Sequence, residues 1–87
     1  MTKRWTRRDG VMATDLGDEI VLLNSQSRAM HTLNATGRVV WTCAEDGLDA
    51  VVEQLCTTFA IDTDTARADA TELLDELVAK GLLDERD

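Results

Sequence analysis

One stretch decides the fold of this chain: Leu33-Asn34-Ala35-Thr36-Gly37-Arg38-Val39-Val40-Trp41, in which a β pattern ends and a helical pattern begins. Asn34 suits the start of a helix, because its side-chain carbonyl accepts a hydrogen bond from a free N–H of the first turn. Leu33, directly before it, is placed to pack as the apolar residue that precedes a helix start. The sequence thus predicts strands before residue 34 and helices after it.

Three runs before this stretch have the composition of β-strands. They cover residues 11–14, 19–23 and 28–33, and the segments between them are rich in turn-forming residues. In the third run, alternate residues are expected on opposite faces: Ala29, His31 and Leu33 on one, and Arg28, Met30 and Thr32 on the other. The short connections favour an antiparallel meander, which is stable only if one of its faces packs on something.

Three runs after the stretch have helical periodicity. They cover residues 35–45, 49–59 and 63–80. Asp46-Gly47 is predicted to end the first helix, Asp49 to cap the second, and Thr63, between two aspartates, to start the third. Lys80-Gly81 is predicted to end the third helix. The apolar stripe of that helix consists of Ala66, Ala70, Leu73, Leu74, Leu77 and Val78.

The predicted fold class is α+β: a three-stranded antiparallel sheet followed by three helices, in a winged helix-turn-helix-like arrangement. The 87 residues are enough for one domain with a modest core. We assign residues 10–87 to that domain and residues 1–9 to a basic N-terminal segment. Residues 1–8 carry a charge of +4 and the remaining chain −12. The basic segment is either a solvated tail or an arm that helps a partner dock, and its Trp5 either packs on the sheet or stays loose.

Hydropathy and charge argue against membranes and nucleic acids as partners. No apolar run approaches the roughly 18 residues that a membrane helix needs, and no apolar stretch follows the basic start as in a signal peptide, so we expect a cytoplasmic protein. A winged-helix fold raises the alternative of DNA binding. However, the third helix sets Arg67 and Lys80 against five acidic residues, whereas DNA binding requires cations that neutralise phosphates.

The residues that commonly perform catalysis or bind metals are few and scattered. Cys43 and Cys56 lack metal-site or redox spacing and lie at apolar helical positions, where a free cysteine behaves as a small buried hydrophobe. His31 has no partner nearby in the sequence that suggests a nucleophile or a ligand set; it is either packed in the core or lines a groove. No glycine-rich loop is present to hold a phosphate. We expect no catalytic residues, no metal and no cofactor.

A set of motifs spread over the chain resembles the PqqD-like family, whose members are also called RiPP recognition elements. The motifs are, in order, Leu33-Asn34, Thr36-Gly37, Trp41, Asp46-Gly47, Asp69 and Gly81-Leu82-Leu83. The resemblance implies a non-catalytic module that binds the leader segment of a ribosomally made precursor peptide and presents it to a modifying enzyme.

The resemblance also implies a place for the peptide. The leader is expected to add as an antiparallel strand to the third strand, so that main-chain hydrogen bonds give affinity and side-chain pockets give selectivity. One wall of the predicted site consists of Arg28, Ala29, Met30, His31, Thr32 and Leu33. The other wall, on the third helix, consists of Ala66, Asp69, Ala70 and Leu73. Asp69 has two open interpretations, a hydrogen bond within the fold or a contact with the leader.

The other motif residues are interpreted structurally. We expect Asn34 to be a helix cap, Gly37 a close approach between helix and sheet, and Trp41 a core anchor. We expect Leu82 and Leu83 to close the core beneath the third helix.

Among such modules, free-standing chains occur in two settings. In lasso-peptide maturation the partner is a separate leader peptidase; in pyrroloquinoline quinone biosynthesis the chain is a peptide chaperone for a radical-SAM enzyme. Thr36-Gly37 and Trp41 look more like the lasso-type chains, so we favour that setting.

Overall fold

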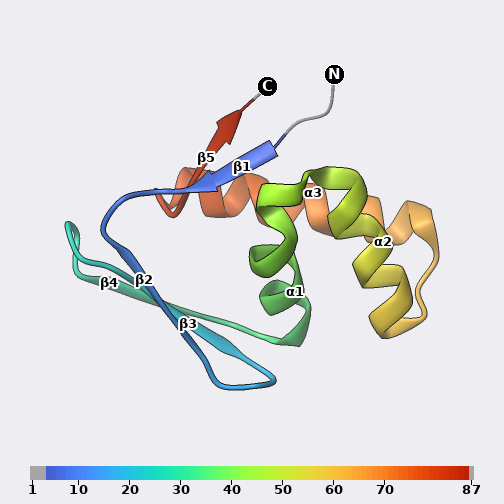
Figure 1. The fold of residues 1–87 in the computed structure, drawn as a ribbon, viewed down its shortest axis with the longest axis horizontal. Helices are drawn as coiled ribbons and strands as arrows, with labels where there is room; N and C mark the ends of the chain where they lie inside the picture. Colours follow the sequence, from blue (N-terminus) through green and yellow to red (C-terminus); the bar gives the residue numbers. More distant parts are fainter. Residues whose placement is uncertain (1–3, 87) are drawn as a thin grey trace.

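The computed structural model describes residues 4–86 and has the predicted α+β architecture (Figure 1). The elements in order are β1 (Arg4–Arg7), β2 (Val11–Asp15), β3 (Ile20–Asn24), β4 (Ala29–Leu33), α1 (Ala35–Cys43), the 3-10 helix η1 (Ala44–Asp46), α2 (Leu48–Phe59), α3 (Thr63–Ala79) and β5 (Leu83–Arg86). A three-stranded sheet precedes the three helices, as expected. A second sheet of two strands, β1 and β5, joins the two ends of the chain.

Strands β2, β3 and β4 form the predicted antiparallel meander, with β3 in the centre. The helices lie on one side of it (Figure 1). Ile20, Leu22 and Leu33 point to that side and are buried, which provides the packing that a small sheet requires. Arg38 of α1 also holds β2, because its Nε and Nη2 each donate to a carboxylate oxygen of Asp15 at 2.8 Å. These hydrogen bonds hold the pKa of Asp15 below its ordinary value.

The two-stranded sheet was not predicted. Arg4–Arg7 pairs with Leu83–Arg86 in antiparallel register, so this part of the basic segment is a strand; residues 1–3 lie outside the described residues. Trp5 is only 3% exposed and Leu83 is fully buried. Two strands alone are marginally stable, and burial of these two side chains in the common core explains why the pair forms.

The helix starts follow local chemistry with one correction. The Asn34 side chain accepts from the Gly37 N–H at 3.0 Å, and the Asp62 side chain accepts from the Thr65 N–H at 3.1 Å. The prediction that Asp49 caps the second helix is wrong. Gly47, with φ of 100°, occupies the cap position, because the 3-10 helix ends at Asp46 and a residue with positive φ then turns the chain directly into α2. Asp49 lies in the first turn.

Three further motif residues have the structural roles expected of them. A Cβ on Gly37 would lie 2.8 Å from the Cβ of Leu33, so glycine permits the close approach of α1 to the end of β4. Trp41 is 1% exposed, and Leu82 is fully buried with its neighbour. The motif thus describes the junction between sheet and helices.

Candidate functional site: the open edge of strand β4

Strand β4 lies at an edge of the three-stranded sheet, and the direction of its free backbone groups follows from the hydrogen bonds of the turns. The Ser25 N–H donates to the Gly10 carbonyl, and the Leu16 N–H donates to the Glu19 carbonyl, both at 2.9 Å. Residues 19 and 25, which flank β3, therefore bond toward β2. Backbone groups alternate in direction along a strand, so the odd-numbered residues of β3 bond to β2 and the even-numbered residues bond to β4.

The register carries this alternation across to β4. Leu22 lies opposite His31, whereas Leu23 lies opposite Met30. His31 therefore exchanges backbone hydrogen bonds with β3. The N–H and C=O groups of Met30 and Thr32 point the other way, toward the open edge. An open edge with free donors and acceptors is a template for another strand.

The side chains of β4 divide as predicted. Leu33 is buried, Ala29 and His31 are half-buried on the side that faces the helices, and Met30 is 66% exposed on the opposite face. A strand added to β4 would thus have one face toward the helices and the other toward solvent.

Helix α3 supplies a charged neighbour that sequence analysis missed. The Lys80 Nζ donates to Glu76 Oε1 at 2.8 Å. Lys80 holds the pKa of Glu76 below its ordinary value, and the charge of His31 acts in the same direction more weakly. The Glu76 side chain is exposed on α3, one turn beyond Leu73. Glu76 lies three residues after Leu73, a spacing that places both on the same side of a helix, and this was the signal in the sequence that could have identified it.

The predicted wall on α3 needs a correction. Ala66 and Ala70 are fully buried because they belong to the stripe that packs α3 into the core, so they offer no surface to a peptide. Asp69 is exposed and Leu73 is half-buried at the margin of the core. Of the four residues predicted for this wall, only Asp69 and Leu73 therefore have accessible surface, and Glu76 is exposed one turn beyond them.

A comparison with known protein families decides the family. The model described as coenzyme PQQ synthesis protein D (PqqD) matches residues 19–83, from the start of β3 to the start of β5. The chain belongs to the PqqD family. No curated protein matches it.

Two solved structures share the fold of this PqqD-family chain. One, described as TbiB1 in complex with the TbiA(beta) leader peptide, has 28% sequence identity and a TM-score of 0.84, with 91% of this chain and 94% of that chain covered. The other, described as lasso peptide synthetase B1 complexed with the leader peptide, has 20% identity and a TM-score of 0.82, with 92% and 96% covered. The second likeness shows the fold alone.

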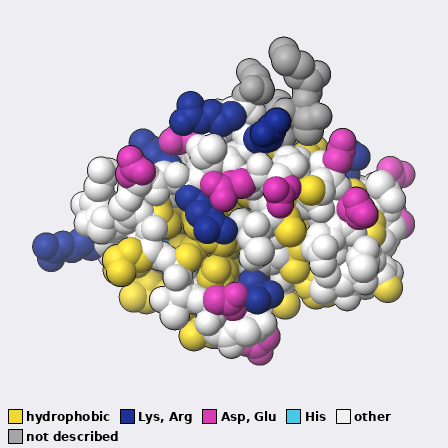
Figure 2. Space-filling model, viewed as in Figure 1, with side chains coloured by type: hydrophobic (Ala, Val, Ile, Leu, Met, Phe, Trp, Pro, Cys, Tyr) yellow, Lys and Arg dark blue, Asp and Glu magenta, His cyan; other side chains and the backbone are white. Residues whose placement is uncertain are grey.

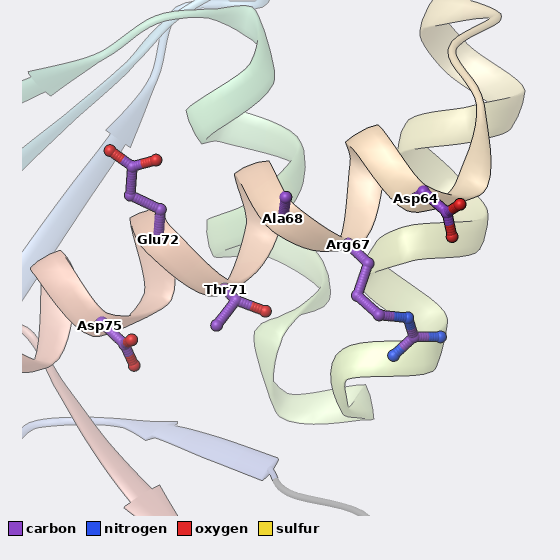
Figure 3. Close-up of a pocket in the computed structure, with 6 residues that line it drawn as sticks. All are labelled: Asp64, Arg67, Ala68, Thr71, Glu72 and Asp75. Atoms are coloured by element: carbon purple, nitrogen blue, oxygen red, sulfur yellow. The ribbon is translucent and has the colours of Figure 1, made fainter.

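An open hollow on the solvent face of α3 lies apart from the predicted wall. It has a volume of about 580 Å³ and is lined by Asp64, Arg67, Ala68, Thr71, Glu72 and Asp75 (Figure 3). Its single cation, Arg67, is paired with Asp49 of α2 at 3.2 Å. The hollow therefore presents mainly carboxylates to solvent and contains no histidine or cysteine.

The described residues contain neither a metal cluster nor a membrane helix. Within residues 4–86, no three His, Cys, Asp or Glu side chains gather in the way that a metal ion requires. None of the helices in this range is both long enough and apolar enough to cross a bilayer.

The two cysteines are free but less buried than the sequence suggested. Both are half-buried and pack against the margin of the core. Burial, followed by the charge of Asp46, raises the pKa of Cys43 above its ordinary value. Cys56 lines a second open hollow, between α2 and α3.

We therefore expect unequal alkylation of the cysteines in the native protein. Cys43 should react with iodoacetamide several-fold more slowly than Cys56, because the thiolate is the nucleophile and a raised pKa lowers its population. Time-resolved labelling with peptide mass spectrometry measures both rates. In urea the two rates should converge; a native Cys43 that reacts as fast as in urea would contradict the structure.

Proposed function

We propose that this PqqD-family chain is a non-catalytic binding protein that captures the leader segment of a ribosomally made precursor peptide at the edge of β4. The observation that carries the proposal is the outward direction of the Met30 and Thr32 backbone groups on an edge strand. Strand addition uses such groups for affinity. The solved relative with 28% sequence identity is described as a complex with a leader peptide, which supports the same class of ligand here.

Selectivity in this proposal comes from the side chains that flank the edge. Inward-pointing residues of the added peptide would lie between Ala29 and His31 of β4 and Asp69, Leu73 and Glu76 of α3. Leu73 offers an apolar contact, while the carboxylates offer partners for a basic or hydrogen-bonding side chain.

The bound leader is then presented to a separate enzyme, for which we favour the leader peptidase of lasso-peptide maturation. The 28% identity to TbiB1, over nearly the whole of both chains, supports this choice. A peptide chaperone in pyrroloquinoline quinone biosynthesis is the second candidate, favoured by the description of the matching family model.

DNA binding by the winged-helix arrangement is the weakest candidate. The solvent face of α3 carries Asp64, Glu72 and Asp75 around one paired arginine, and the chain has a net charge of −8. Phosphate contacts supply most of the non-specific affinity for DNA, so we expect negligible DNA binding at physiological salt.

Amide hydrogen exchange by NMR tests the proposed function at single residues. Candidate leaders are the N-terminal segments of short precursor peptides encoded near this chain, and they include peptides of the lasso type and of the pyrroloquinoline quinone type. Fluorescence polarisation first identifies which of them binds. The leader that binds should protect the Met30 and Thr32 amides at least tenfold, because each gains a main-chain acceptor. The amides of Ala13 and Asp15, which point away from β3 at the other edge, are the matched control.

Protection of Ala13 and Asp15 instead would place the peptide on β2. The absence of any bound leader, with DNA binding in its place, would overturn the proposed function.

A further inference from the structure

The face of the three-stranded sheet that points away from the helices carries two cross-strand rows of side chains. Strand register and alternation assign their members. The first row consists of Met12, Leu23 and Met30. The second consists of Thr14, Val21 and Thr32. Between them lies the row that contains Leu22, whose side chain points into the core. We call these two rows the outer sheet face.

The outer sheet face is uncovered. Met12 is 62% exposed and Met30 66%, and the helices of the described chain lie on the opposite side (Figure 1). Figure 2 shows hydrophobic side chains at the surface around the three-stranded sheet, at the lower left of the view. Leu16, 55% exposed in the β2–β3 turn, extends the apolar area. Several large apolar side chains exposed on one face are typical of an interaction site, and methionine adapts well to a partner.

The two ends of the outer sheet face carry opposite charges. Arg28 lies in the β3–β4 turn at one end, and Asp18 and Glu19 lie in the β2–β3 turn at the other. All three side chains are exposed. The charge of Asp18 acts on the guanidinium of Arg38, which is itself paired with Asp15, so Arg28 and Glu19 are the two charges that remain available to a partner. If a second copy of this face is turned end to end, its positive end lies opposite the negative end of the first copy.

We propose that the outer sheet face binds the same face of a second copy of this chain. The two copies stack face to face. The two-fold axis that relates them lies between the sheets, perpendicular to the strands and level with the Leu22 row. The strands of the two sheets therefore run in opposite directions. The methionine row of each copy then packs on the smaller Thr14–Val21–Thr32 row of its partner. Arg28 of each copy approaches Asp18 and Glu19 of the other, so every contact occurs twice, as in an isologous dimer.

This arrangement resembles the face-to-face packing of two sheets in a β-sandwich. Only two short rows per copy are buried, so the interface lies at the small end of specific interfaces and the dimer should form reversibly. Both β4 edges remain open, which makes dimerisation independent of the proposed leader binding. The net charge of −8 per chain repels at long range, and physiological salt, about 0.15 M, screens that repulsion.

Sedimentation equilibrium of the full chain without peptide tests the proposal. The mass should rise from that of the 9.6 kDa monomer toward twice that value as the protein concentration increases from micromolar to millimolar. The double variant Met12→Ser/Met30→Ser should raise the dimer dissociation constant more than about tenfold, since four apolar side chains per dimer lose their burial. Its melting temperature should stay near that of the parent, because both positions are exposed.

Exchanging the charges of Arg28 and Glu19 tests whether the two copies stack in the proposed end-to-end orientation. Arg28→Glu should weaken the dimer, and Arg28→Glu combined with Glu19→Arg should restore it at an unchanged net charge. A monomer at every concentration would overturn the proposal. So would a dimer that survives the serine variant and is lost in Ala13→Pro, because that dimer would pair through the β2 edge.

Discussion

Met30→Pro is expected to reduce the affinity for the leader at least a hundredfold while the protein stays folded. Proline removes the Met30 N–H, which points to the open edge and takes no part in the β3–β4 ladder, and proline also disfavours the interior of a paired strand. The loss of one main-chain hydrogen bond and of strand geometry accounts for several kcal/mol in binding, whereas the internal ladder keeps its bonds. Fluorescence polarisation with the labelled leader measures the affinity.

Two matched variants separate the edge from the side chain. Met30→Ala keeps the backbone and should bind within a few-fold of the parent, because strand addition depends mainly on main-chain groups. Ala13→Pro makes the same backbone change on β2, at the other edge, and should bind like the parent. Circular dichroism melts of all three confirm the fold. A folded Met30→Pro protein with parental affinity would exclude strand addition at β4.

Trp41→Ala is expected to have the largest effect on stability. Trp41 is 1% exposed and lies within the core where α1 meets the rest of the fold. Truncation of a buried tryptophan costs about 3–5 kcal/mol, a large share of the roughly 5–10 kcal/mol that holds a domain of this size. The variant should therefore unfold at a much lower urea concentration than the parent, as measured by urea titration with circular dichroism.

Trp41→Phe and Arg7→Ala distinguish the sources of this stability. Within the described residues the indole N–H of Trp41 has no hydrogen-bond partner, so phenylalanine loses volume without losing a bond, and we expect a cost of about 1–2 kcal/mol. The Arg7 guanidinium lies 5.1 Å from the centre of the Trp41 ring; its removal should cost about 0.5–1 kcal/mol. A Trp41→Ala protein with parental stability would mean that this core assignment is wrong.

Local chemistry made the junction between sheet and helices predictable. The Asn34 cap, the close approach at Gly37 and the positive φ of Gly81 each depend on residues only a few positions away. The alternation in residues 28–33 likewise predicted which side chains of β4 face the helices. The prediction that Asp49 caps α2 failed because the cap, Gly47, lies two residues earlier, after a 3-10 turn that the helical spacing does not reveal.

The walls of the candidate site were harder to predict. Ala66 and Ala70 lie on the same side of α3 as Leu73, and periodicity cannot separate residues that fill the core from residues at its margin. The exposed fraction of each side chain distinguishes the two groups. That fraction depends on which residues of α1 and α2 cover each position of α3. The electrostatic effect of His31 on Glu76 joins a strand to a helix about 45 residues later in the chain, and spacing along one helix cannot reveal it.

The sequence by itself determined the order of strands and helices, the ends of most of them, the alternation of β4 and the family resemblance. All of these depend on short-range hydrogen bonding and on side-chain spacing. The tertiary structure decided the rest: the pairing of Arg4–Arg7 with Leu83–Arg86, the position of β4 at an edge, and the uncovered outer sheet face. These features require contacts between residues far apart in the chain, and the burial of apolar surface in a common core, to which Trp5 and Leu83 contribute, selects them.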